Sequence, residues 1–126
     1  MDVREATPDD VDELESLVEG PLDATQLIHD RTVILAETAD GIQGFVSYDI
    51  FDDAVHVSTI VGDADALEAL LAEPRRFAAA EELPIEIVVP ESAATLKRVV
   101  QTVGFEPVGD GPRFDGEPTR RFRYAR

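Results

Sequence analysis

The stretch Ser58–Leu71, "STIVGDADALEALL", decides the fold, because a strand passes into a helix at Gly62 with almost no loop between them. Residues before Gly62 are rich in β-branched side chains, which favours a strand, and the leucines after it recur at helical spacing. A helix N-terminus offers unpaired N–H groups and a positive dipole end, which suit a phosphate. Two carboxylates, Asp63 and Asp65, stand there instead. The junction is therefore an anion site, an altered one, or only a helix start.

The length and composition predict one globular domain that spans residues 1–126. No apolar run approaches the ~20 residues of a membrane span, so no membrane partner is expected. The N-terminal "MDVREATPDD" has neither the basic nor the apolar region of a secretory signal. The chain has no cysteine, which excludes disulfides and thiolate sites. We expect a cytoplasmic protein.

The charge is strongly acidic, with 27 acidic residues against 11 basic ones and a formal net charge of −16. Lys97 is the only lysine. This composition resembles that of proteins from salt-loving archaea, whose charged surfaces stay hydrated in concentrated salt. Binding to nucleic acid needs a basic footprint, so no nucleic-acid partner is expected.

The C-terminal residues 112–126 differ, since they hold five of the arginines. These are Arg113, Arg120, Arg121, Arg123 and Arg126. They form either an anion site or a basic strand that pairs with acidic neighbours, and we favour the strand. In "TRRFRYAR", alternation predicts that Phe122 and Tyr124 are buried, with Arg121 and Arg123 together on the other face. That pair would hold carboxylates of this chain or of a second copy in a homodimer.

The order of elements predicts an α+β fold with a mixed sheet of about six strands flanked by helices. After a first strand and a helix that begins near Thr7-Pro8, three antiparallel strands form a meander at Val33–Thr38, Ile42–Ile50 and Ala54–Val61. The helix after Gly62 contains Pro74, which should kink or split it. A buried strand "PIEIVV", a helix "SAATLKRVVQTV", and the strands "FEPVG" and "TRRFRYA" complete the chain.

Three stretches in this order resemble the GCN5-related N-acetyltransferase (GNAT) family. They are "VREATPDDVDEL" at residues 3–14, "VILAETADGIQGFVSY" at 33–48 and "LKRVVQTVGFEPVG" at 96–109. The last of these, a helix closed by Gly-Phe-Glu and a strand, is the most specific. The likeness follows nearly the whole chain and implies the GNAT fold.

The resemblance implies a cleft for acetyl-CoA between two parallel strands that splay apart, here Ala54–Val61 and Ile85–Val89. In the family, a backbone N–H of the first strand polarises the thioester carbonyl. The next loop, Arg/Gln-x-x-Gly-x-Gly/Ala, wraps the pyrophosphate at a helix N-terminus. A carboxylate or histidine deprotonates the acceptor amine, and a tyrosine of the last helix protonates the thiolate.

The loop motif matches residues 59–64, so the resemblance assigns cofactor binding to a short segment. Its members are Ser58, Thr59, Ile60, Gly62, Asp63 and Ala64. Three features depart from the family: Thr59 replaces Arg or Gln, the loop is shorter and acidic, and Val100 stands where the tyrosine is usual.

Glu86 and His56 are the candidate catalytic residues. Glu86 is the only charge in "PIEIVV", on a strand that lines the cleft in this family. His56 lies on the strand that should present the thioester. Each has a plain alternative as a hydrogen-bonded strand residue. Two isolated histidines, His29 and His56, predict no metal site.

Two functions follow from these observations. The first is acetyl-CoA-dependent transfer of an acetyl group to a primary amine on a small molecule or protein. The alternative is a catalytically silent GNAT-like module that binds a protein partner or a small effector. The scaffold and Gly62-x-Ala64 favour the enzyme, whereas the altered loop and Val100 favour the module.

Overall fold

The computed structural model describes residues 1–18, 20–113 and 116–125. These residues form one mixed sheet in the order β1-β2-β3-β4-β5-β7-β6, in which only β4 and β5 are parallel. The strands are β1 (Asp2–Glu5), β2 (Thr32–Thr38), β3 (Gly41–Phe51), β4 (Ala54–Gly62), β5 (Ile85–Pro90), β6 (Glu106–Asp110) and β7 (Thr119–Tyr124). The expected α+β class is confirmed, with seven strands among the described residues where we expected about six.

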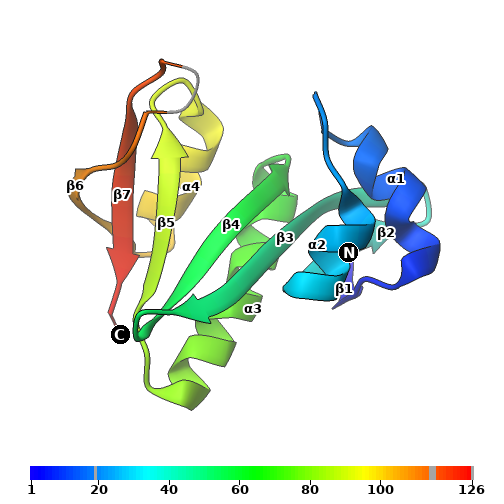
Figure 1. Cartoon of the computed structure of the whole chain (residues 1–126), viewed down its shortest axis with the longest axis horizontal. Helices are drawn as coiled ribbons and strands as arrows, with labels where there is room; N and C mark the ends of the chain where they lie inside the picture. Colours follow the sequence, from blue (N-terminus) through cyan, green and yellow to red (C-terminus); the bar gives the residue numbers. More distant parts are fainter. Residues whose placement is uncertain (19, 114–115, 126) are drawn as a thin grey trace.

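A 3-10 turn and four α-helices flank the sheet. They are η1 (Pro8–Asp10), α1 (Val11–Ser16), α2 (Ala24–Asp30), α3 (Ala64–Glu81) and α4 (Ala94–Thr102). Figure 1 shows α1 and α2 beside β1, β2 and β3, whereas α3 lies along β3 and β4, and α4 lies beside β5 and β7. No helix among the described residues is long and apolar enough to span a membrane.

Pro74 does not split α3, contrary to one of the outcomes that the sequence predicted. Leu67, Leu70 and Leu71 before the proline and Ala78 after it are all buried in one core with the sheet. Pro74 itself is fully buried. Packing of both halves of the helix on the same sheet therefore outweighs the loss of one backbone hydrogen bond.

Two hydrophobic cores occupy opposite faces of the sheet. The larger lies under α3 and α4 and includes Val55, Val57, Ile85 and Ile87 from the central strands. The smaller lies between α1, α2 and the strands β2 and β3, and it includes the fully buried Phe45. Because α1 and α2 cover only the first half of the sheet, no helix of the described residues covers β4, β5 and β7 on that face.

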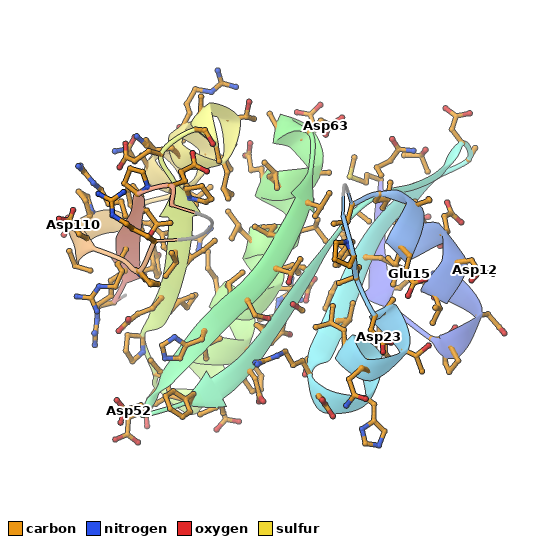
Figure 2. The ribbon with its side chains drawn as sticks, turned by 45° about the horizontal axis from the view of Figure 1, so that its top comes forward. Asp12, Glu15, Asp23, Asp52, Asp63 and Asp110 are labelled. Atoms are coloured by element: carbon orange, nitrogen blue, oxygen red, sulfur yellow. The ribbon has the colours of Figure 1, made fainter. Side chains whose placement is uncertain are left out.

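The acidic side chains lie mostly at the periphery, and Figure 2 shows Asp12, Asp52, Asp63 and Asp110 pointing outward from separate elements. Glu15 has a structural role, because its carboxylate accepts a hydrogen bond from the backbone N–H of Ala24 at 2.9 Å. That bond fixes the start of α2 against α1. The negative charge is thus spread over the surface and is not concentrated on one element.

The last strand has the faces that alternation predicted. Phe122 is fully buried and Tyr124 half-buried, whereas Arg121 and Arg123 are exposed on the other face. Arg123 donates to Glu86 at 2.8 Å, which confirms a contact with a carboxylate of the same chain. Arg126 lies outside the described residues.

The N-terminal strand is held to the sheet by Arg4. Its guanidinium binds Asp10 through two nitrogens, at 2.9 and 3.0 Å, and Glu37 of β2 at 2.7 Å. Asp10 also accepts from the N–H of Thr7 at 2.8 Å, which caps the first helical turn. Hydrogen bonding from Arg4, then that from Thr7, lowers the pKa of Asp10 to about 2.

Asp10→Asn should therefore destabilise the protein by on the order of 1–2 kcal/mol near neutral pH, because the variant loses the charge to which Arg4 and the N–H of Thr7 donate. Because the pKa of Asp10 is depressed from 3.8 to about 2, its stabilisation is present above pH 3.8 and is lost as the pH falls through that interval. Denaturant unfolding of the variant and the parent across this range measures the difference. Asp9→Asn, an exposed neighbour, is the control, and an equal effect of both variants would contradict the assignment.

Candidate active site

A cleft opens in the middle of the sheet, between β4 and β5. The two strands pair only at Val55–Ile85, His56–Glu86 and Val57–Ile87. Beyond these pairs, β4 continues along β3 as far as Gly62, and β5 continues along β7 as far as Pro90. Figure 1 shows the strands diverging from their shared end. The backbone edges that face each other after Val57 and Ile87 are thus available to a ligand.

A β-bulge at Ser58 accompanies the divergence. Tyr48 of β3 pairs with Val57 and Ser47 pairs with Thr59, so Ser58 is an extra residue in β4. Such a bulge bends the strand and shifts the alternation of its side chains. Accordingly, Val57 and Ile60 both pack toward the α3–α4 core. The hydroxyl groups of Ser58 and the buried Ser47 lie 2.7 Å apart and tie the bulge to β3.

Two adjoining hollows line the cleft and share Ile60 and Leu96. The first, of about 220 Å³, is lined by Val57, Ser58, Thr59, Ile60, Ile87, Val88, Pro90 and Leu96. The second, of about 430 Å³, is lined by Ile60, Val61, Gly62, Leu67, Ser92, Ala93, Ala94, Thr95 and Leu96. Their walls are mostly apolar side chains of β4, β5 and α4. Ser58, Thr59, Ile60 and Gly62, four of the predicted cofactor-binding residues, therefore border one continuous groove.

The other two predicted residues, Asp63 and Ala64, begin α3. Asp63 is its N-cap, and the carboxylate accepts a hydrogen bond from the N–H of Ala66 at 2.9 Å. Asp65 adds a second carboxylate in the first turn. The side chain of Asp63 thus takes one of the N–H groups that an anion would use, and its charge opposes a second anion there.

Gly62 has a structural reason to be glycine. Its φ of +152° is one that L-residues with a side chain rarely adopt, and an added Cβ would lie 2.9 Å from the Cβ of Ala66. Gly62 also pairs with Gly44 of β3, where an added Cβ would lie 2.2 Å from the carbonyl oxygen of Val61. This pair of glycines lets the first turn of α3 approach the end of the sheet.

The two candidate catalytic residues are brought together. His56 and Glu86 are register partners across β4 and β5, on the face that carries no helix at this point. Asp49 of β3, Arg123 of β7 and Glu106 of β6 continue the same row. The Glu86 side chain is only 19% exposed, and its carboxylate accepts a hydrogen bond from Arg123 at 2.8 Å. The His56 ring contacts Phe51 edge-on, with centroids 5.8 Å apart.

The last helix supplies no tyrosine to this cleft. Val100, which stands at the position where the family usually has one, is fully buried in the α3–α4 core. The two tyrosines lie elsewhere: Tyr48 packs on Phe77 of α3, and Tyr124 lies at the end of β7. Burial raises the pKa of Tyr48. Among the described residues no cluster of three or more His, Asp or Glu could hold a metal ion.

Solved structures of N-acetyltransferases share this arrangement over nearly their whole length, so the chain has the GNAT acyltransferase fold. The ribosomal-protein-alanine N-acetyltransferase from Brucella melitensis matches with a TM-score of 0.82 and 18% identity, over 98% of this chain and 99% of that one. A GNAT-family acetyltransferase from Bacillus cereus matches with a TM-score of 0.74 and 21% identity, over 98% and 95%. The aminoglycoside 6'-N-acetyltransferase from Enterococcus faecium matches with a TM-score of 0.76 and 12% identity, over 98% and 96%.

No protein-family model matches the sequence, and no curated protein matches it. Two residues of the site were not predicted from the sequence: Ser47, whose hydroxyl holds the bulge, and Leu96, which lines both hollows. A serine within the apolar run "GFVSYDI" was the available signal for Ser47. Nothing in the sequence distinguished Leu96 from the other leucines on helical faces.

Gly62→Ala tests whether this glycine is needed for packing. The added methyl group would meet Ala66, so the free energy of unfolding should fall by more than the ~1 kcal/mol that backbone strain alone costs. Gly20→Ala is the matched control, because Gly20 also has a positive φ, of +98°, but has open space around it. Urea unfolding of both variants gives the comparison. Equal losses would show that the contact with Ala66 does not constrain the position.

Proposed function

We propose that this protein is an acetyl-CoA-dependent N-acetyltransferase that acts on a primary amine. The observation that carries the proposal is the short ladder between β4 and β5, which leaves the bulged backbone at Ser58 facing an apolar groove. Transfer from a thioester needs a donor for the carbonyl oxygen, and a backbone N–H serves without any particular side chain. The GNAT fold supports the proposal, and the nature of the amine stays open.

The groove fits one part of acetyl-CoA better than the other. A pantetheine arm is extended and carries amides, so it suits strand edges with free backbone groups and apolar walls. The pyrophosphate would lie at the start of α3, where Asp63 already caps the helix and Asp65 adds negative charge. When bound, the cofactor would supply the acetyl thioester. Ser58, Thr59 and Ile60 would hold its arm, and Gly62, Asp63 and Ala64 would lie next to its phosphates.

Glu86 and His56 would act on the acceptor. Both lie on the helix-free face beside the point where the strands part, so an amine could reach the groove from that side. The hydrogen bond from Arg123 holds the Glu86 carboxylate in a fixed orientation. Either residue could take the proton from an ammonium group, directly or through a water molecule. No tyrosine lies at the usual acid position, and the leaving thiolate would be protonated by solvent.

Binding is tested by thermal unfolding in concentrated KCl with acetyl-CoA and, separately, with S-acetylpantetheine, which lacks the pyrophosphate and nucleotide. A ligand at 100 times its dissociation constant adds about 2.7 kcal/mol of stability. Asp63→Asn keeps an N-cap but removes the charge, so in dilute salt acetyl-CoA should bind about fivefold more tightly, whereas S-acetylpantetheine should be unaffected. Concentrated KCl should reduce this gain, because it screens the repulsion that the substitution removes. Asp40→Asn, in the turn between β2 and β3, controls for net charge. If neither ligand shifts the melting of the parent at millimolar concentration, the enzyme proposal fails.

Catalysis is tested by thiol release from acetyl-CoA with a panel of primary amines. Replacing the true base should lower kcat/KM by about 10²–10⁴-fold. Glu86→Gln and His56→Gln are the two variants, and Glu106→Gln is the control because Glu106 is the opposite register neighbour of Arg123. A loss below tenfold in both would remove these residues from the reaction.

A second candidate is a catalytically silent module that binds a protein partner or a small effector. Two observations favour it: the carboxylate of Asp63 on the N-terminus of α3, and the buried Val100 in place of a tyrosine. This alternative gives no stabilisation by either thioester and no thiol release with any amine.

A further inference from the structure

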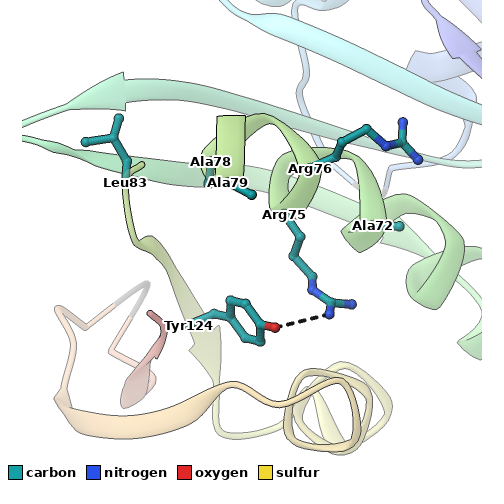
Figure 3. A pocket seen from close by; sticks show the side chains of 7 residues that line it. All are labelled: Ala72, Arg75, Arg76, Ala78, Ala79, Leu83 and Tyr124. Carbon is teal, nitrogen blue, oxygen red and sulfur yellow. Dashed lines mark hydrogen bonds between the residues drawn. The ribbon is translucent and has the colours of Figure 1, made fainter. Parts of the chain in front are cut away.

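A second cavity lies outside the cleft, between the C-terminal half of α3 and the end of β7. Its volume is about 590 Å³, and Figure 3 shows the side chains that line it. They are Ala72, Arg75, Arg76, Ala78, Ala79, Leu83 and Tyr124. None of these residues lines either hollow of the β4–β5 groove. The cavity is therefore a separate feature of the α3 side of the sheet.

Arg75 and Tyr124 point toward one another across this cavity. The guanidinium carbon lies 4.8 Å from the centre of the phenol ring, and Nη2 donates to the phenol oxygen at 3.3 Å. Nε of Arg75 is buried and has no hydrogen-bond partner among the described residues. Nε is closed off from the cavity, so a ligand there would meet the guanidinium at Nη1, which is not buried and makes no hydrogen bond among the described residues. A polar group of this kind is normally satisfied by water, an ion or a ligand.

Arg75 differs from the other described arginines because it is half-buried and has no carboxylate partner: Arg31, Arg98, Arg113 and Arg121 also lack one but are exposed, and Arg4, which is half-buried too, is paired. Arg4, Arg76, Arg120 and Arg123 each contact a carboxylate, as does Lys97. Arg75 forms no such pair within the described residues, although the chain has 27 acidic residues. Its hydrogen-bond acceptor is a neutral phenol. Among the described residues, no carboxylate neutralises the positive charge that Arg75 brings to the cavity.

The other walls indicate what kind of anion would fit. Ala72, Ala78, Ala79 and Leu83 present apolar surface, which suits a short hydrocarbon body. Arg76 is already paired with Glu73 at 2.8 Å, so one positive charge is left for the ligand. One guanidinium fork matches a planar monoanion and would leave part of a phosphate dianion uncompensated. The phenol accepts from Arg75, and its own proton is free to donate.

We propose that this cavity binds a small monocarboxylate, with the carboxylate held by Arg75 and the Tyr124 hydroxyl and the apolar body against Ala78, Ala79 and Leu83. The site would be distinct from the groove that is proposed for acetyl-CoA. It stands whether the protein is an acetyltransferase or a silent module, since none of its residues belongs to that groove.

Butyrate is the probe, added as its potassium salt in place of KCl at constant potassium. The parent should bind it and show a higher melting temperature, whereas butyramide, its neutral isostere, should not bind. Arg75→Gln should weaken butyrate binding more than tenfold, as loss of a hydrogen-bonded charge partner does. Arg98→Gln, which removes an exposed arginine of α4, should leave binding unchanged. Calorimetry gives the dissociation constants.

A measurement on the parent protein covers the case in which Arg75→Gln does not fold. In ¹⁵N-edited spectra, one arginine Nε–H signal should shift on addition of butyrate, and this signal should be missing in Arg75→Lys. The proposal is overturned if butyrate gives no shift of that signal. It is also overturned if inorganic phosphate or butyramide binds as tightly as butyrate, or if Arg75→Gln binds as well as the parent.

Discussion

The structure depends on how the backbone hydrogen bonds of two strands are shared. β4 is bonded along its length to β3, and β5 to β7, but β4 and β5 are bonded to each other over only three residue pairs. The bulge at Ser58 bends β4 away, and the Ser47–Ser58 contact holds that bend. Each strand keeps a full ladder on its outer side, so the sheet can open in the middle and remain folded. The groove is a consequence of this arrangement.

The same constraint explains why the junction after Gly62 is so compact. β4 stays paired with β3 to its end at Gly62, α3 begins at Ala64, and the Gly44–Gly62 pair gives its first turn room to pack. The helix then needs a cap, which Asp63 supplies. A carboxylate in this place stabilises the free protein and opposes an anionic ligand. Concentrated salt would limit the electrostatic repulsion to distances of ~3 Å. The N–H of Ala66 would still be bonded to Asp63 and would not be free for a ligand.

Much of the fold was readable from the sequence, because periodicity records which faces are buried. Alternation placed Phe122 and Tyr124 correctly, and turn residues located the meander. Pro74 did not split α3, because the packing of both helix halves depends on contacts that local propensity does not contain. The opening between β4 and β5 came from a family likeness, since a bulge leaves no distinct mark in "HVSTIVG". His56 and Glu86 lie next to each other because of the parallel register of β4 and β5. This register could not be predicted, because the two strands are far apart in the sequence.

In the candidate site, the backbone and the side chains would have different functions. The neighbouring structures share the fold at 12–21% identity, so most side chains differ between them and this chain. The bulge and the short ladder are backbone features that many sequences can form. A thioester carbonyl bound by a backbone N–H therefore makes little demand on residue identity, whereas phosphate binding and proton transfer need particular groups at particular positions. The departures at Asp63 and Val100 fall in that second category. If the groove binds acetyl-CoA as proposed, these two departures affect the nucleotide end and the source of protons, and they leave the groove for the thiol arm unchanged.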